Sequence, residues 1–167
     1  MDRAGAARGV GEGNNIAYEV NYIVRVYMTT DVRWQQRFKN LNRAFTQLEK
    51  AVRLESYTDL EREGLIQRFE YTYELAWKTL QDFLEFTGYV DVKGPRPVIE
   101  QAFKNGIIED GNGWMAMKKS RELTSHTYDE DTAIEIANAI KNRYYNLFRA
   151  LMSKLETERS GEQGSIF

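Results

Sequence analysis

The feature that most constrains the fold is a large apolar residue at every third or fourth position along two long segments. In the first segment, residues 31–55, these positions hold Trp34, Phe38, Leu41, Phe45, Leu48 and Val52. In the second segment, residues 59–86, they hold Ile66, Phe69, Tyr73, Ala76, Leu80 and Phe83. Residues three and four apart lie on the same face of an α-helix. The spacing therefore predicts two long helices that each bury one face, and the second is expected to be central and to end near Gly88.

The region after Gly88 contains both prolines of the chain and a glycine-rich turn. Pro97 is well placed to begin a short helix that ends at Asn105-Gly106, because proline is favoured in the first helical turn. Residues 110–113, Asp-Gly-Asn-Gly, are typical of a turn. A fourth helix of limited length is therefore expected from Trp114 to Leu123.

The last helix is predicted to begin at a cap formed by Asp129 or Asp131 and to fray from Ser160. Its core stripe reads Ala133, Ala137, Ile140, Tyr144, Leu147 and Leu151. The connections between all these elements are short, so neighbouring helices should run antiparallel. The sequence thus predicts an all-α, antiparallel up-and-down helical bundle of four main helices plus one short helix, which we expect to be dimeric.

The first 27 residues differ from the rest of the chain. They begin with a Gly/Ala-rich stretch, and from Ile16 to Tyr27 apolar and polar residues alternate as in a β-strand. An exposed run of this kind would need a cover or a partner strand. Because the helical pattern starts only after Met28, this methionine is a candidate for the natural start. We therefore expect an N-terminal extension (1–27), a helical bundle (28–160) and a flexible tail (161–167).

The composition excludes several classes of site. The chain has no cysteine and one histidine, so it has no disulfides, thiolate metal ligands or cysteine nucleophile. A zinc or iron centre would depend almost wholly on carboxylates, and we expect neither a metal nor a cofactor. No apolar run approaches the roughly 20 residues that span a bilayer, and the N-terminus does not have the pattern of a signal peptide. A cytoplasmic protein without a membrane partner is expected.

The charge distribution limits how the chain can meet nucleic acid. The net charge is −2, so no overall positive field attracts RNA. Any RNA contact must be local. The candidate cations are Lys118, Lys119 and Arg121 in one stretch and Lys93 and Arg96 in another, although lysines near a helix end are often simply solvated.

One short stretch, Arg121 to Tyr128 (RELTSHTY), combines the side chains needed for phosphate chemistry without a metal. Arginine is a permanent cation whose planar fork matches phosphate oxygens. Histidine is the side chain that ordinarily titrates near neutral pH, and tyrosine offers a hydroxyl that can donate a proton or accept a modification. The candidate catalytic residues are therefore Arg121 and His126, and Tyr128 is the candidate modification residue.

Arg121 and His126 would not share a face of a regular helix, because residues five apart point about 140° away from each other. Either the helix breaks at Thr124-Ser125, where the hydroxyls compete for backbone hydrogen bonds, or a two-fold dimer combines two copies of the motif. If the helix persists instead, Glu122 can orient the imidazole of His126. Simpler roles remain open: a helix-terminal histidine, an arginine in a surface ion pair and a half-buried tyrosine in a turn.

The RELTSHTY stretch on an all-helical chain resembles the Arg-x4-His-x-Tyr motif of the HEPN family. Within it the chain is most similar to the nucleotidyltransferase substrate-binding proteins, a branch similar to the HepT toxins. The likeness covers about residues 29–158 and includes FEYTYELAWKTL at 69–80. It implies a homodimer or higher oligomer, a minimal nucleotidyltransferase encoded nearby as antitoxin-like partner, and metal-independent RNase activity at a dimer cleft.

The resemblance also implies that the transferase switches the toxin off by adding AMP to the motif tyrosine, here Tyr128. Family members often carry a small polar residue after the arginine, whereas this chain has Glu122, whose charge opposes RNA phosphate. We therefore hold two hypotheses: an endoribonuclease with Lys118, Lys119 and Glu122 in supporting positions, and a non-catalytic substrate-binding subunit of a two-component nucleotidyltransferase.

Overall fold

The computed structural model describes residues 12–164, and these residues form helices and short connections without a strand. The helices are α1 (Glu12–Val52), α2 (Asp59–Phe86), α3 (Pro95–Lys104), α4 (Gly111–Leu123), α5 (Glu130–Ala139) and α6 (Tyr145–Gly164). A 3₁₀ turn, Thr124–His126, follows α4, and a π turn, Ile140–Tyr144, joins α5 to α6 as one continuous helix. The predicted all-α class with five helices is thus confirmed for the described residues.

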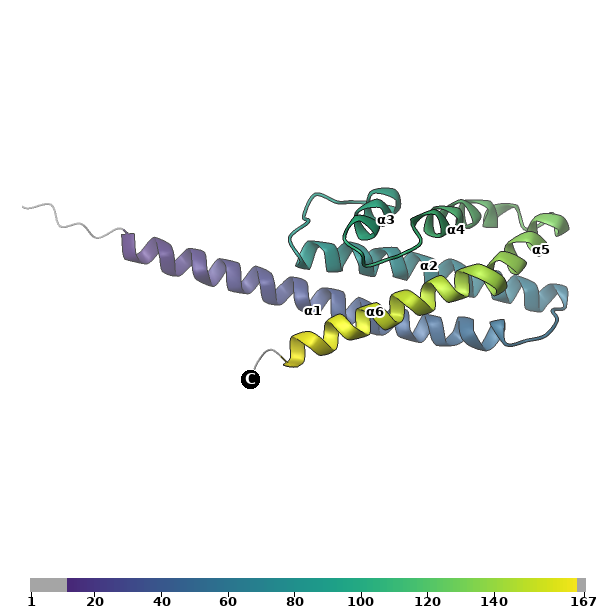
Figure 1. The fold of residues 1–167 in the computed structure, drawn as a ribbon, viewed down its shortest axis with the longest axis horizontal. Coiled ribbons are helices and arrows are strands. Elements are labelled where there is room, and N and C mark those ends of the chain that lie inside the picture. Colours follow the sequence, from purple (N-terminus) through teal and green to yellow (C-terminus); the bar gives the residue numbers. More distant parts are fainter. Residues whose placement is uncertain (1–11, 165–167) are drawn as a thin grey trace, which may run out of the picture.

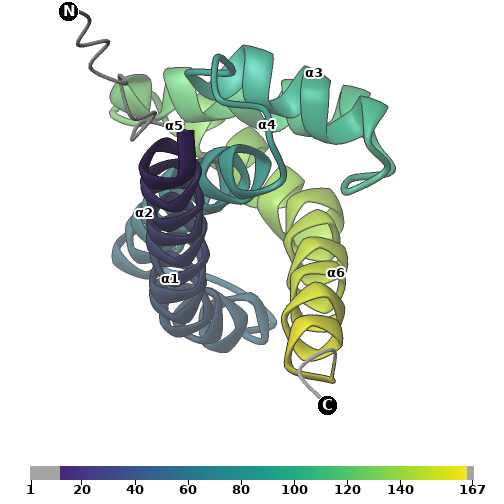
Figure 2. The same cartoon turned by 90° about the vertical axis from the view of Figure 1, so that its left-hand side faces the viewer.

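The helices form an elongated bundle around α2. Helices α1 and α2 run antiparallel side by side, α6 returns along them, and the shorter α3 and α4 cover another side of α2 (Figures 1 and 2). All six residues of the predicted α2 stripe are buried, and Phe69 stacks on Tyr144 with ring centroids 5.6 Å apart. The bounds predicted for α2, 59–86, are those observed, because Thr58 and Glu61 form a capping box at its start and Gly88 takes a positive φ after its end.

Two shorter helices begin earlier than predicted. Helix α3 starts at Pro95 and not at Pro97, because Gly94 with a φ of +85° turns the chain directly into the helix. Helix α4 starts at Gly111, so residues predicted as a turn are its first helical turn. The Asp110 carboxylate accepts a hydrogen bond of 2.8 Å from the Gly113 N–H, which caps this end.

The end of the chain agrees with the prediction in its cap and differs in its length. Asp129 is the N-cap of α5, and its carboxylate accepts a 3.0 Å hydrogen bond from the Thr132 N–H. Helix α6 continues to Gly164, past Ser160 where fraying was expected and into the predicted flexible tail of residues 161–167. The last three residues, 165–167, lie outside the described residues.

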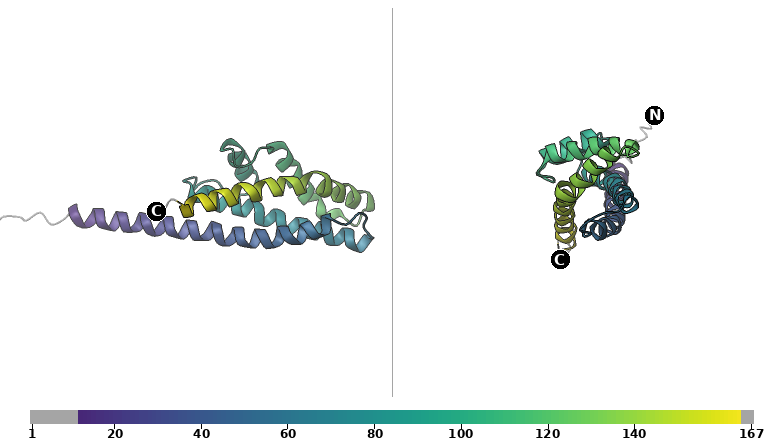
Figure 3. Two further views of the ribbon diagram at one scale, coloured as in Figure 1. Left: turned by 60° about the horizontal axis from the view of Figure 1, so that its bottom comes forward. Right: turned by 90° about the vertical axis from the view of Figure 1, so that its right-hand side faces the viewer.

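The strand expected from Ile16 to Tyr27 is wrong, because these residues belong to α1. Residues that alternate along a strand also include pairs four apart, which share a helix face. A lone strand lacks a hydrogen-bonding partner, whereas a helix already formed in the bundle extends without a new nucleation step. This part of α1 projects beyond the other helices (Figure 3). Residues 1–11 lie outside the described residues, and a start at Met28 stays a prediction.

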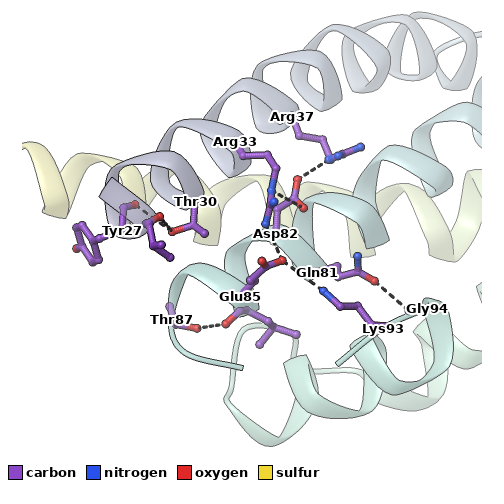
Figure 4. A network of polar contacts seen from close by, with 12 residues as sticks. Tyr27, Thr30, Arg33, Arg37, Gln81, Asp82, Glu85, Thr87, Lys93 and Gly94 are labelled. Atoms are coloured by element: carbon purple, nitrogen blue, oxygen red, sulfur yellow. Dashed lines mark hydrogen bonds and ion pairs between the residues drawn. The ribbon is translucent and has the colours of Figure 1, made fainter. Parts of the chain in front are cut away.

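A partly buried group of charges fixes α1 against α2 and the following loop (Figure 4). The carboxylate of Asp82, which is 4% exposed, lies 2.6 Å from Arg37 and 3.3 Å from Arg33. Arg33 also lies 2.6 Å from Glu85, which in turn contacts Lys93 at 3.4 Å. A buried carboxylate is tolerated only when cations neutralise it. The network therefore sets the register of α1 on α2 where α1 leaves the bundle.

None of the helices within residues 12–164 combines the length and apolar character that crossing a bilayer requires.

Candidate functional site

Of the alternatives that the sequence left open for the motif, the helix break is present. Helix α4 ends at Leu123, and the hydroxyls of Thr124, Ser125 and Thr127 each donate to the carbonyl three residues earlier, at 2.7, 3.2 and 3.1 Å. These side chains satisfy carbonyls that lose their helical partners at a C-terminus. The chain consequently turns through residues 124–129 before α5 begins at Glu130.

This turn brings His126 and Tyr128 together. The His126 Nδ1 atom lies 3.3 Å from the Tyr128 hydroxyl, and the two rings meet edge to face at 5.9 Å. Tyr128 is 85% exposed. Both side chains line a hollow of about 530 Å³ between the end of α4 and α5. A histidine and an accessible tyrosine therefore share one open hollow.

Arg121 lies on a different side of the same turn. Its guanidinium contacts two carboxylates of α2, Glu70 at 3.0 Å and Glu74 at 3.5 Å. It also donates a 3.0 Å hydrogen bond to the Thr124 hydroxyl. Arg121 is not among the residues that line the hollow of His126. In one chain the structure thus joins His126 to Tyr128 and holds Arg121 against α2, so a catalytic pairing of Arg121 with His126 stays a prediction.

The supporting residues are placed as follows. Glu122 forms an ion pair with Lys118, one helical turn earlier, and does not pair with His126. The Glu122–His126 contact required an unbroken helix, which the 3₁₀ turn precludes. Lys119 is exposed on α4.

The second group of cations is engaged in ion pairs. Lys93 contacts Glu85 at 3.4 Å and Arg96 contacts Glu100 at 2.9 Å. The first pair joins the segment before α3 to α2, and the second lies within α3.

Several residues near the motif were not predicted from the sequence. Glu70 and Glu74 are one turn apart on the polar edge of α2, and their spacing was the signal that they could share one cation. Tyr144 and Ser120 line the hollow with their hydroxyls 2.7 Å apart. Tyr144 is also the last residue of the π turn, and π turns are frequent at functional sites.

Tyr73, next to Glu74 on α2, is a buried tyrosine. The Tyr73 hydroxyl is buried and has no hydrogen-bond partner among the described residues, and burial followed by the nearby charge of Glu74 raises the pKa of Tyr73. Tyr73 is therefore neutral and belongs to the core. Among the side chains that the structure describes, no three His, Asp or Glu residues gather closely enough to hold a metal ion.

This chain is similar to known proteins in both sequence and fold. A family model described as "Nucleotidyltransferase substrate binding protein like" matches residues 36–157. A protein of Haemophilus influenzae named probable ribonuclease HepT is 34% identical over 77 residues, which are 44% of this chain and 53% of that protein. The chain thus spans about half the length of this curated relative.

Two solved structures superpose on the bundle. A protein of Thermus thermophilus gives a TM-score of 0.63 at 31% identity and covers 69% of this chain and 98% of its own. A Haemophilus influenzae protein described as having the fold of a substrate-binding domain of a nucleotidyltransferase gives 0.61 at 28% identity, covering 71% and 98%. Because the family model spans most of the described helices, the chain belongs to the nucleotidyltransferase substrate-binding protein family.

Proposed function

We propose that the chain is the partner subunit of a nucleotidyltransferase and carries an endoribonuclease site, with Arg121 and His126 as the catalytic pair and Tyr128 as the residue that the transferase modifies. The observation that carries this proposal is the 3.3 Å contact between His126 Nδ1 and the exposed Tyr128 hydroxyl at an open hollow. A group added to that hydroxyl would lie directly beside the imidazole. The family match and the relative named probable ribonuclease HepT support the same assignment.

RNA cleavage at this site needs no metal. His126 accepts the proton of a ribose 2′-hydroxyl, whose oxygen then attacks the adjacent phosphorus. The bond from phosphorus to the 5′ oxygen breaks, that oxygen takes up a proton, and the products are a 2′,3′-cyclic phosphate and a 5′-hydroxyl. Arg121 stabilises the charge on the phosphorane oxygens. It would do so either by exchanging Glu70 and Glu74 for the RNA phosphate, or across a dimer in which two copies of the motif meet.

Modification of Tyr128 would regulate this chemistry. The phenolic oxygen attacks the α-phosphorus of ATP, the bond to pyrophosphate breaks, and the phenolic proton is released to solvent. The resulting AMP ester adds bulk and negative charge within two residues of His126. Because an RNA phosphate is also negative, the modified site repels its substrate.

The catalytic part is tested by incubating purified protein with RNA in the presence of EDTA. Cleavage is expected, and His126→Ala and Arg121→Ala should each reduce it about 100-fold or more, the usual scale for loss of an acid–base group. Lys154→Ala, which removes an ion-paired cation of α6, is the matched control and should cleave normally. Full cleavage by both site variants would remove the assignment.

The modification is tested by co-expression with the neighbouring transferase and intact-mass measurement. The wild type should gain the mass of one or more AMP units, and Tyr128→Phe should gain none. Tyr89→Phe removes a hydroxyl from another exposed tyrosine and should behave as the wild type. A gain that persists in Tyr128→Phe would place the modification on another residue.

A second candidate function, a non-catalytic substrate-binding subunit, is favoured by the position of Arg121. Its ion pairs with Glu70 and Glu74 keep the guanidinium occupied on the α2 side. The double variant Glu70→Gln/Glu74→Gln removes both carboxylate charges and should increase RNA cleavage if these pairs merely restrain the arginine. If wild type and double variant both bind the transferase and neither cleaves RNA, the non-catalytic function is correct.

A further inference from the structure

The apolar stripe of α1 does not stop where the bundle stops. Ile16, Val20, Ile23 and Tyr27 repeat the spacing of 4, 3 and 4 residues that characterises the buried half of the helix. They lie in line with Trp34 and the residues after it. Yet their side chains are 63%, 52%, 64% and 55% exposed, whereas Trp34 is 0% exposed. We call these four residues the free stripe.

The exposed apolar side chains of this half are not confined to the free stripe. Six more apolar side chains of the same half of α1 are 43–73% exposed: Tyr18, Tyr22, Val24, Val26, Met28 and Val32. Because successive residues turn by about 100°, these six point to the other faces of the helix. A helix that is apolar all round is ordinarily buried. A partner is therefore expected to cover this half of α1, and the free stripe is the face that continues the buried stripe of the bundle.

Charge decides against two kinds of occupant. Between residues 15 and 28 the only charged side chains are Glu19 and Arg25. A helix that lies on an anionic membrane carries several lysines or arginines on its polar face, and a nucleic-acid surface also needs clustered cations. This part of α1 has neither, so its partner should be another apolar helix.

We propose that two copies of this chain pair through the free stripe, as a two-helix coiled coil formed by the projecting halves of α1. Spacings of 3 and 4 are those that place side chains of one helix between those of a neighbour. A two-fold axis matches one stripe with its own copy. The projecting half extends past α6 and past the end of α2, where Tyr27 touches Phe86 with ring centroids 5.0 Å apart. A second helix can therefore lie along the residues before Tyr27 without meeting the bundle (Figures 1 and 3).

This pairing is independent of the proposed function. The family model begins at residue 36, so the free stripe lies outside the part shared with the family. Loss of the pairing would leave the hollow of His126 and Tyr128 intact, because the projecting half of α1 and the turn between α4 and α5 lie at different ends of the bundle (Figure 1). Failure of one proposal is therefore distinguishable from failure of the other.

Cysteine cross-linking tests the proposal without background, because the natural chain contains no cysteine. Single variants of the full chain, Ile16→Cys, Val20→Cys, Ile23→Cys and Tyr27→Cys, are oxidised and compared with Asn21→Cys and Arg25→Cys, which lie on other faces of the helix. The yield of covalent dimer is expected to be at least tenfold higher at the free-stripe positions than at the control positions. All four positions react in a parallel pair, and only those near the two-fold axis react in an antiparallel pair. Equal cross-linking at stripe and control positions would overturn the proposal.

Solution mass provides the second measurement. The double variant Val20→Glu/Ile23→Glu should halve the mass of the wild-type assembly, while Asn21→Glu/Arg25→Glu should leave it unchanged. Helical content and thermal midpoint of the bundle should be the same in all three proteins, which separates lost pairing from lost folding. A wild type and a stripe variant of equal mass would contradict self-pairing, whether the wild type is a monomer or associates through another face.

Discussion

The two halves of α1 carry the same apolar spacing in opposite surroundings. In the C-terminal half, Trp34 packs against Phe83 with ring centroids 5.1 Å apart and is buried. In the N-terminal half, Ile23 occupies an equivalent position and is 64% exposed. Between them Tyr27 makes a single aromatic contact, with Phe86 at the end of α2. Periodicity therefore determines where a helix can bury a face, and the presence of a neighbouring helix determines whether that face is buried.

The largest expected difference between the halves is the cost of truncating a stripe residue. Trp34→Ala should lower the free energy of unfolding by about 3–5 kcal/mol, because it leaves a cavity in the core. Ile23→Ala should change it by less than about 0.5 kcal/mol in the dissociated chain, as expected for an exposed side chain. Urea unfolding at low protein concentration measures both. Similar losses in the two variants would show that the N-terminal half is packed within the monomer.

The next effect concerns the charge network at the border between the halves. Asp82→Ala should destabilise the fold by about 3 kcal/mol, because it leaves Arg33 and Arg37 without their buried carboxylate. Glu100→Gln is the control: its pair with Arg96 is exposed, so the loss should stay below about 1 kcal/mol. Equal midpoints of urea unfolding for the two variants would contradict a structural role for the network.

A smaller effect should appear at acid pH. Arg33, 2.6 Å from the Glu85 carboxylate, lowers the pKa of Glu85. A carboxyl whose pKa is lowered by folding stabilises the protein fully above its ordinary pKa of about 4.3, and this stabilisation is lost as the pH falls through the lowered value. In Glu85→Gln the thermal midpoint should therefore fall less steeply below about pH 5 than in the wild type. Parallel curves for the two proteins would rule out this contribution.

The smallest effect should come from helix propensity in the exposed half. Asn21→Ala replaces a poor helix former by the best one and should stabilise this half of α1 locally by about 0.5 kcal/mol. Amide hydrogen exchange of residues near position 21 should slow about twofold, while the core amides of α2 stay unchanged. Slower exchange throughout α2 would mean that the N-terminal half of α1 and the bundle unfold as one unit.

The candidate site shows the same division between pattern and packing. A break at Thr124-Ser125 was one of the alternatives that the sequence offered, because short hydroxyl side chains compete locally for backbone carbonyls. The contact of His126 with Tyr128 follows from that local turn. The direction of Arg121 was not predictable, since it depends on Glu70 and Glu74, about fifty residues earlier in the chain on a helix that only packing brings alongside.

The sequence by itself determined the helical class, the bounds of α2, an aspartate cap for the last helix at position 129 or 131, and the position of the motif at a helix end. Each of these depends on residues within a few positions of one another, whose spacing and hydrogen-bonding groups act locally. Only the tertiary structure decided that residues 16–27 are helical and exposed, and that Arg121 faces α2 and not the hollow of His126. Both outcomes depend on which distant segment lies alongside, and a local pattern does not contain that information.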